Sequence, residues 1–175
     1  QLAMVAIQLD MPDEAKALYE DSKRYDLLNK MFQANGEPDN AIEVAEKYDR
    51  INLKNTFYSA AKYYEAANNF QQAIELYEKA GTHTKEVPRM LLEAQKLAEL
   101  EDYVEKKKDK ELYLWLGQYK ESIGYLDDAI SYYEQAGSSS NLVRLHLSQN
   151  QLDAARKICN TDSEPQACFL LARYL

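Results

Sequence analysis

The sequence is poor in the residues that interrupt regular secondary structure, with 5 glycines and 4 prolines among 175 residues. That supply leaves little material for β-hairpin turns, and no segment alternates apolar and polar residues for long enough to indicate a strand. Uninterrupted apolar runs are short, and none approaches the ~20 residues that a membrane-spanning helix needs. No charged leader followed by an apolar stretch opens the chain. We therefore expect a soluble intracellular chain with no β-sheet and no direct membrane insertion.

Cysteine and histidine are equally scarce. Cys159 and Cys168 lie nine residues apart, unlike the close pairs of structural zinc sites, and each falls at an apolar position of a separate expected helix. We expect reduced thiols that pack as small hydrophobes. His83 is expected in an exposed polar turn, Gly81–Lys85, and His146 on a helix face. Neither histidine has the sequence neighbours of a catalytic base or a metal ligand.

Positive charge is in the minority, since Lys plus Arg total 21 and Asp plus Glu 29, for a formal net charge of −8. An acidic surface of that size repels a phosphate backbone, so nucleic acid is not expected as a partner. Many carboxylates lie near expected helix starts, where the helix dipole stabilises negative charge. We therefore interpret them as helix-terminus residues and not as a catalytic acid pair. These residues are Glu99, Glu101, Asp102, Asp127 and Asp128. With no glycine-rich phosphate loop either, the sequence predicts no enzyme, no catalytic residue, no cofactor and no metal site.

What the sequence does contain is a repeated helical pattern. Residues 61–81 hold two apolar-periodic segments separated by Asn68 and Asn69, and residues 116–137 hold a second copy. Small and aromatic residues recur in both copies at intervals that resemble the tetratricopeptide helix-turn-helix unit. The matching positions are Ala61, Tyr64, Ala73, Tyr77 and Ala80 in the first copy, and Gly117, Ala129, Tyr133 and Ala136 in the second.

The same spacing extends along the whole chain. One anchor residue is expected in the second helix of each pair, three positions after the Pro, Phe or Leu that begins that helix, and successive anchors lie 26 to 32 residues apart. The anchors are Ala15, Ala41, Ala73, Tyr103, Ala129 and Ala155. Five positions before them stand Asp10, Gly36, Asn68, Ala98, Gly124 and Asn150. Four of these six are Gly or Asn, which tolerate the left-handed backbone at a helix end.

This spacing predicts six helix pairs followed by one unpaired C-terminal helix that begins at Glu164 or Pro165. We expect residues 1–175 to form a single all-α segment, a right-handed superhelical α-solenoid of tetratricopeptide-like repeats. Leu2, Val5, Ile7, Phe169, Leu171 and Leu175 are expected to lie at uncapped ends of the array. Together with the missing initiating Met, those ends predict an excerpt of a longer solenoid.

The fourth pair is the least regular. Tyr103 replaces the small anchor, so a distortion is expected there. The second helix of this pair ends in Lys106–Lys108, and cations at a helix C-terminus oppose the negative end of the dipole, each contributing ~0.3–1 kcal/mol. We interpret the lysine run as a solvated helix end. The longest helix is expected in the third pair, starting near Asn52.

Tyrosine is abundant, with 14 residues. The adjacent pairs Tyr63–Tyr64 and Tyr132–Tyr133 have the composition of an aromatic ligand platform. Neighbouring residues on a helix point about 100° apart, however, so one ring of each pair is expected in the core and the other against the next repeat or the groove. We interpret the tyrosines as packing residues.

Several strings resemble one family closely, the intraflagellar transport protein 140 family, in its C-terminal solenoid. They are Lys23–Lys30, His83–Leu91, Tyr103–Trp115, Tyr132–Ala136, Leu142–His146 and Leu170–Leu175. The resemblance implies a non-enzymatic scaffold of intraflagellar transport complex A, which serves retrograde ciliary transport and receptor entry into cilia. It implies the other complex A subunits as partners, along with ciliary cargo adaptors. The implied location is the cilium or flagellum, the basal body and the cytoplasm. It assigns no partner-binding residues.

Two other functions stay open. A stand-alone adaptor of the tetratricopeptide type would bind short peptide tails through cationic or amide side chains on its concave face. Lys54, Asn55, Lys62 and Arg144 are the candidates for that role, although they do not form a repeated array. An enzyme would need active-site residues outside this sequence.

Overall fold

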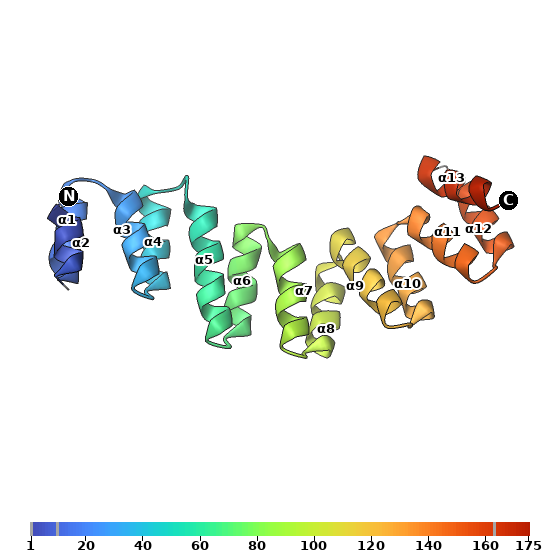
Figure 1. Ribbon diagram of the computed structural model, residues 1–175, viewed down its shortest axis with the longest axis horizontal. Coiled ribbons are helices and arrows are strands. Elements are labelled where there is room, and N and C mark those ends of the chain that lie inside the picture. Colours follow the sequence, from blue (N-terminus) through green and yellow to red (C-terminus); the bar gives the residue numbers. More distant parts are fainter. Residues whose placement is uncertain (1, 10, 163) are drawn as a thin grey trace. The chain divides into compact units, whose positions relative to one another are not determined.

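The computed structural model describes residues 2–9, 11–162 and 164–175. Within those residues the chain forms thirteen α-helices and no strand (Figure 1). The helices are α1 (Leu2–Gln8), α2 (Pro12–Asp21), α3 (Tyr25–Ala34), α4 (Pro38–Tyr48), α5 (Leu53–Ala66), α6 (Phe70–Ala80), α7 (His83–Glu93), α8 (Leu97–Lys107), α9 (Lys110–Ser122), α10 (Leu126–Ala136), α11 (Ser139–Ser148), α12 (Leu152–Thr161) and α13 (Pro165–Tyr174). The prediction of six consecutive pairs followed by one further helix is confirmed for this part of the chain.

The chain divides into two compact units, residues 1–91 and residues 92–175. The N-terminal unit holds α1 to α6 and most of α7. The C-terminal unit holds α8 to α13. The prediction of one continuous segment over residues 1–175, and of a right-handed superhelix, stays a prediction.

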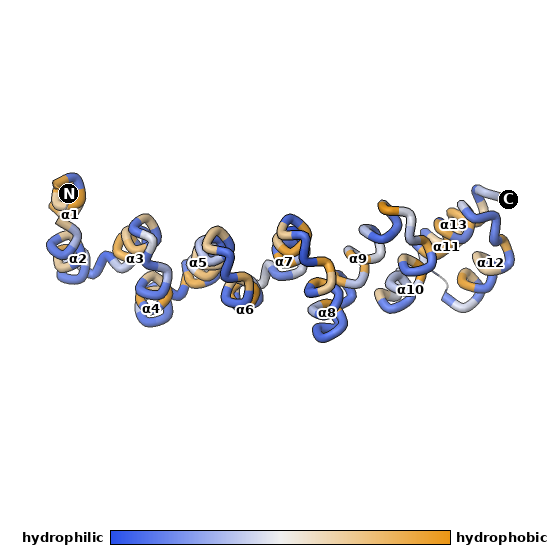
Figure 2. Tube along the Cα trace, turned by 90° about the horizontal axis from the view of Figure 1, so that it is seen from below, coloured by the Kyte–Doolittle hydropathy of each residue, from blue (hydrophilic) through white to orange (hydrophobic). Residues whose placement is uncertain are grey.

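Within each unit, helices that follow one another pack side by side. The closest packing joins α5 to α6 and α9 to α10, and further contacts join one pair to the next, as between α4 and α5 or α11 and α13. Figure 2 shows that the hydrophobic side of most helices faces a neighbouring helix. Because each pair covers the apolar face of the next, this packing confirms the tetratricopeptide-like solenoid fold.

The small anchors sit where the helices of a pair approach each other. Five of the six predicted anchors have no exposed surface, namely Ala15, Ala41, Ala73, Ala129 and Ala155. A small side chain at such a point lets two helix backbones come close, while larger neighbours fill the space beside it. The expected left-handed residues are also confirmed at Gly36, Asn68, Gly124 and Asn150. Asp10 lies outside the described residues.

The fourth pair departs from the prediction. Ala98 lies inside α8, and the left-handed residue is Gln95, with φ 59°. The anchor is therefore Leu100, which is fully buried, while Tyr103 is only half-buried. The placement was wrong by three residues because Gln95 occupies a position where four of the other five pairs have Gly or Asn.

Two further expectations concern the helices themselves. The first helix of the third pair, α5, is the longest of the described helices at 14 residues, as predicted. Lys106 and Lys107 form the last turn of α8, and Lys108 is its left-handed C-cap. All three lysines are exposed. This position fits the interpretation of a solvated helix end opposing the dipole.

The outermost helices expose large apolar side chains. Helix α1 buries Ala3 and Ala6 but leaves Leu2, Val5 and Ile7 exposed. At the other end Phe169 and Leu175 are exposed, as expected, and α13 packs against α11 and α12. Leu171 is a correction, because it is half-buried against the cluster formed by Val143, Leu147, Ala155 and Ala167. The prediction of an excerpt from a longer solenoid stays a prediction.

Candidate functional site

The side chains with potential for chemistry are dispersed. His83 was predicted to lie in an exposed polar turn, and this prediction is wrong. His83 begins α7 and is half-buried. The turn was misplaced because the Thr82 carbonyl already accepts from the amides of Lys85 and Glu86, at 3.2 and 3.0 Å, so the helix starts at once. His146 lies on α11, as expected, with Nδ1 2.7 Å from Oε1 of Gln151.

The two cysteines lie on neighbouring helices, Cys159 on α12 and Cys168 on α13. Both are free thiols and half-buried, and Cys159 packs against the apolar cluster at the end of the C-terminal unit. Burial raises the pKa of Cys159, and the neighbouring Cys168 raises it further. A thiol with a raised pKa is a poor nucleophile at neutral pH. No group of three or more His, Cys, Asp or Glu among the described residues is arranged to hold a metal ion.

Three of the five carboxylates that the sequence interprets as helix-terminus residues pair with lysines. Glu101 lies 2.6 Å from Nζ of Lys120, and Asp128 lies 3.7 Å from the same atom. Glu99 pairs with Lys96 at 2.8 Å. These pairs join neighbouring helices or close a helix turn, so the carboxylates serve the packing of the repeats.

The tyrosine pairs pack largely as expected. Tyr133 is fully buried, and Tyr132 stacks on Tyr113 with ring centroids 6.4 Å apart. The Tyr64 hydroxyl donates to Asp39 at 2.8 Å. Burial and this hydrogen bond raise the pKa of Tyr64 to about 12. Tyr63 is the more exposed ring, lying beside Tyr64 in an edge-on contact.

The most organised polar cluster of the N-terminal unit joins three consecutive helices. Glu65 on α5 accepts a hydrogen bond from the Tyr77 hydroxyl of α6 and two from the Arg89 guanidinium of α7, both at 2.9 Å. We call Glu65, Tyr77 and Arg89 the N-terminal triad. Arg89 also donates to Glu86 at 3.0 Å, and Lys62 donates to Glu86 at 3.1 Å.

The C-terminal unit repeats this arrangement. Glu121 on α9 accepts from the Tyr133 hydroxyl of α10 at 2.7 Å and from both terminal nitrogens of Arg144 on α11, at 2.7 and 2.6 Å. We call Glu121, Tyr133 and Arg144 the C-terminal triad. In each triad a glutamate near the end of one pair's first helix joins the second helix of that pair to the first helix of the next. The triads therefore bind adjacent repeats together.

The electrostatics of the triads follow from this geometry. Burial alone would raise the pKa of Glu65, but the hydrogen bonds from Tyr77 and Arg89 lower it. The hydrogen bond from Arg144 lowers the pKa of Glu121, and Tyr133 contributes to the same effect. Burial and the adjacent carboxylates raise the pKa of both triad tyrosines, which stay neutral donors. Each cluster is thus a charge-assisted network with all three members satisfied.

Two of the candidate peptide-binding cations, Lys62 and Arg144, are paired with carboxylates in or beside the triads. Lys62 lies 3.5 Å from Glu65 and 3.1 Å from Glu86, and Arg144 is bound by Glu121. Lys54 and Asn55 are exposed on α5, about two helix turns before Lys62. The structure brings Lys62 together with carboxylates of its own chain, and it holds Arg144 in a different unit from the other three candidates. No convergent set of free cations results among the described residues.

Sequence reasoning missed the triads, although a signal for them exists. Tyrosine follows glutamate by 12 residues in both, and arginine follows glutamate by 24 residues in one and 23 in the other. Those intervals approach half a repeat and a full repeat. A search for polar residues at repeat spacing, in addition to small ones, would have found them.

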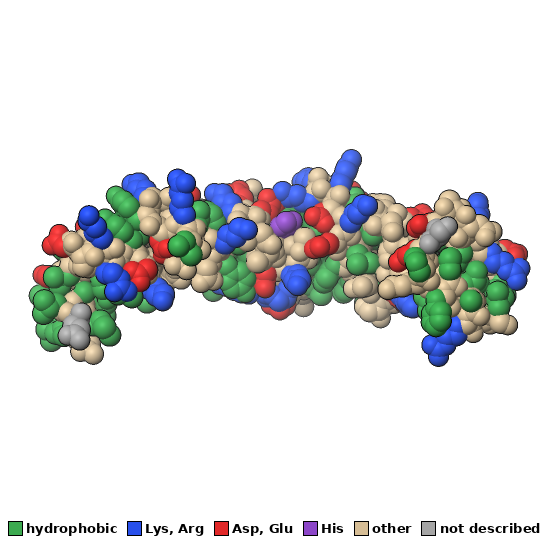
Figure 3. All heavy atoms as spheres, turned by 90° about the horizontal axis from the view of Figure 1, so that it is seen from above, with side chains coloured by type: hydrophobic (Ala, Val, Ile, Leu, Met, Phe, Trp, Pro, Cys, Tyr) green, Lys and Arg blue, Asp and Glu red, His purple; other side chains and the backbone are tan. Residues whose placement is uncertain are grey.

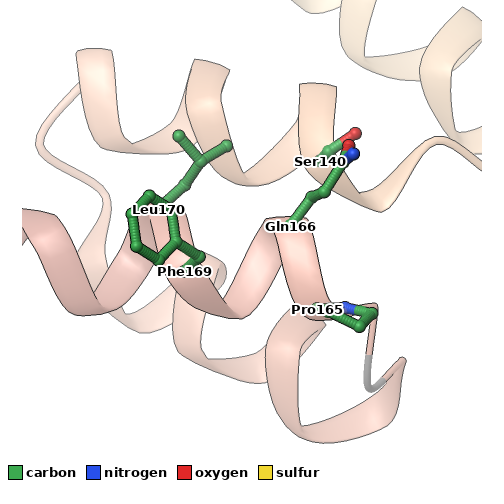
Figure 4. Close-up of a pocket in the computed structure, with 5 residues that line it drawn as sticks. All are labelled: Ser140, Pro165, Gln166, Phe169 and Leu170. Carbon is green, nitrogen blue, oxygen red and sulfur yellow. The ribbon is translucent and has the colours of Figure 1, made fainter.

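Two open hollows of the surface have partly apolar linings. One pocket of about 370 Å³ lies between the start of α11 and α13, and Figure 4 shows its lining of Ser140, Pro165, Gln166, Phe169 and Leu170. Another, of about 510 Å³, is lined by residues of α1, α2 and the start of α3, among them Leu2, Leu18 and Leu27. Neither lining combines a nucleophile with a base. On the face shown in Figure 3, acidic and basic side chains are intermixed in each unit.

No described helix is both long enough and apolar enough to cross a bilayer. The comparison with protein families gives a match over the full length. A family model for the tetratricopeptide-repeat (TPR) domain of intraflagellar transport proteins 140 and 172 matches residues 1–175. The match agrees with the resemblance in the sequence and with the paired-helix fold.

Proposed function

This chain belongs to the family of TPR domains found in intraflagellar transport proteins 140 and 172, and we propose that it acts as a non-enzymatic interaction scaffold of an intraflagellar transport complex. The observation that carries the proposal is the full-length family match over a repeat fold whose polar groups bind repeat to repeat. A stack of paired helices presents an extended surface, on which affinity comes from area and shape complementarity.

The triads support the scaffold over the peptide-binding adaptor. An anionic peptide tail would need free cations on one face, whereas Lys62, Arg89 and Arg144 are bound by Glu65, Glu86 and Glu121. Displacing an arginine from a bidentate carboxylate would leave the partly buried Glu65 or Glu121 uncompensated. The paired arginines therefore hold the surface in shape and do not capture ligands.

In the finer form of the proposal, the chain is a segment of a complex A subunit that serves retrograde ciliary transport and receptor entry. Its partners are the other complex A subunits and ciliary cargo adaptors. It acts at the cilium or flagellum, the basal body and the cytoplasm. The family match supports a role in intraflagellar transport, because its two named members are intraflagellar transport proteins. The resemblance of strings such as His83–Leu91 and Tyr103–Trp115 to protein 140 supports the assignment to complex A.

The test is to purify the tagged full-length protein from ciliated cells, with residues 1–175 present or deleted. We expect the intact protein to copurify with complex A subunits and the deletion to lose at least one of them. Accumulation of transport particles at the ciliary tip in cells with the deletion tests the retrograde role, and loss of ciliary receptors tests the entry role. Undiminished copurification of every subunit with the deletion protein would contradict the scaffold assignment.

A further inference from the structure

The connection between α4 and α5 differs from the other connections between helix pairs. Four residues, 49–52, separate Tyr48 from Leu53, whereas two or three residues separate the other successive pairs of described helices. Figure 1 shows this connection rising beyond the ends of both helices. The anchors Ala41 and Ala73 on either side are 32 residues apart, the widest interval in the chain. Most of this extra length lies in α5, which has 14 residues, and the α4–α5 turn itself is one or two residues longer than the other connections.

The turn projects one large apolar side chain almost completely into solvent. Ile51 is 96% exposed, more than any other large apolar residue described, and Tyr48 at the base of the turn is 59% exposed. An isoleucine in that position contributes nothing to the core. Isolated exposed hydrophobes are common on protein surfaces, so exposure alone assigns no role, and the construction of the turn has to be considered with it.

The turn is held rigidly. Asn52 donates two side-chain hydrogen bonds to the Asp49 carboxylate at 3.0 and 2.9 Å, and its amide donates to the Asp49 carbonyl at 3.1 Å. The Asp49 amide continues the α4 ladder by donating to Ala45 at 3.1 Å. Tyr48 stacks on Tyr25 of α3, with ring centroids 4.1 Å apart. Ile51 therefore projects from a turn that is closed by its own hydrogen bonds, which lowers the entropy that the turn loses on binding.

Two exposed cations, Arg50 and Lys54, lie close to Ile51 along the chain, together with the Asp49 carboxylate. Arg50 and Lys54 are exposed, and neither forms a side-chain hydrogen bond or ion pair with any other residue that the structure describes. The nearby Asp49 carboxylate accepts from the Asn52 side chain and keeps its negative charge, so the two cations exceed it by one. In Figure 3, hydrophobic side chains lie beside Lys or Arg side chains over α4 and α5. The turn therefore presents an exposed apolar side chain beside two unpaired cations, in a chain whose net charge is −8.

We propose that the α4–α5 turn is a docking knob, in which Ile51 enters an apolar pocket of a partner protein and Arg50 and Lys54 meet carboxylates on the pocket rim. Arginine and tyrosine are among the side chains that concentrate binding energy in protein interfaces, and an apolar side chain that fills a pocket supplies the buried centre of such a contact. A flat polyanion does not fit, because the acidic chain repels it. The inference rests on the scaffold function and adds to it a contact site and the chemistry of the partner.

The test compares two matched substitutions in the full-length protein, Ile51→Asp and Ile123→Asp. Ile123 is also an exposed isoleucine at a helix end, 44% accessible, but in a shorter connection. The probe is a complex A preparation that lacks this subunit, and the affinity is measured by titrating it with each labelled protein. We expect Ile51→Asp to weaken binding at least tenfold and Ile123→Asp to change it less than twofold. Arg50→Glu is expected to weaken binding and to slow association at low salt.

Equal thermal melting of the three proteins is expected, since neither isoleucine is buried, and it excludes misfolding as the cause. If the unchanged protein does not bind the complex, the scaffold function itself fails. If it binds and Ile51→Asp binds equally well, only the docking knob is wrong. Binding of anionic vesicles that depends on Ile51, with complex binding unaffected, would also overturn the proposal.

Discussion

Replacing Gly117 by alanine is expected to destabilise the C-terminal unit, although alanine is the better helix former. Gly117 lies inside α9, where a methyl group would sit 2.8 Å from both Cδ1 and Cε1 of Tyr133. Real Cβ atoms are not found that close to a ring carbon, so the ring or the helix must move. Tyr133 has no exposed surface, and Glu121 holds its hydroxyl at 2.7 Å. The ring therefore cannot swing aside without breaking the C-terminal triad.

The magnitude follows from two opposed effects. Replacing a helical glycine by alanine stabilises a helix by about 1 kcal/mol. Overpacking a close contact costs about 1–3 kcal/mol, and a displaced charge-assisted hydrogen bond adds about 1.5–3 kcal/mol if it is lost. Since overpacking exceeds the gain in helix propensity over most of its range, we expect a net loss of up to about 2 kcal/mol, and more if Tyr133 leaves Glu121.

The assay is urea denaturation followed by the fluorescence of Trp115, the only tryptophan in the chain. Trp115 lies on α9 two residues from Gly117 and stacks on Tyr119, so its emission reports the folding of this pair of helices. The exposed neighbour Gln118, replaced by alanine, serves as the control and should leave the midpoint within error. A midpoint for Gly117→Ala equal to or above that of the unchanged protein would refute the argument that Gly117 exists to admit Tyr133.

Three further predictions use the same measurement. Arg144→Met should destabilise the C-terminal unit by about 1–2 kcal/mol, because it leaves the Glu121 carboxylate with one partner while partial exposure limits the cost. A change below about 0.3 kcal/mol, roughly the error of such measurements, would show that the triad does not contribute to stability. The lowered pKa of Glu121 contributes stability that is present above its ordinary value of 4.5 and is lost as pH falls through the lower folded value, so the unit should weaken below about pH 4.5, and Glu121→Gln should flatten that dependence. Leu100→Ala should cost about 2–5 kcal/mol and Tyr103→Ala clearly less, because Leu100 is the buried anchor; the reverse order would restore the anchor that the sequence pattern favoured.

Much of the fold could be predicted because the repeat leaves its mark on small residues. Alanines at Ala41, Ala73 and Ala129 are required for close helix approach, and their spacing is visible without any structure. The anchor of the fourth pair was predicted wrongly because the left-handed position is occupied by Gln95, which the local pattern does not distinguish from a helical residue. The backbone there is imposed by the packing of the repeat, and packing is not a local property of the sequence.

The polar network could not be predicted in the same way. Glu65 and Arg89 are 24 residues apart, and their contact depends on how one pair of helices stacks on the next. Arg144 was a candidate ligand-binding cation in the sequence analysis, because the residue type alone does not show whether an arginine is paired with a carboxylate. Only the position of the neighbouring carboxylate, here Glu121, separates the two roles. Likewise the exposure of Ile51 follows from the course of the α4–α5 turn, which no periodicity reports.

The central claim is that residues 1–175 bind other proteins of an intraflagellar transport complex through their repeat surface. Cross-linking of the native complex with a lysine-reactive reagent, followed by mass spectrometry, tests it most directly. We expect cross-links from lysines of this segment to other complex subunits, with Lys54 beside the α4–α5 turn among them. Efficient modification of these lysines with links only inside the segment itself would contradict it.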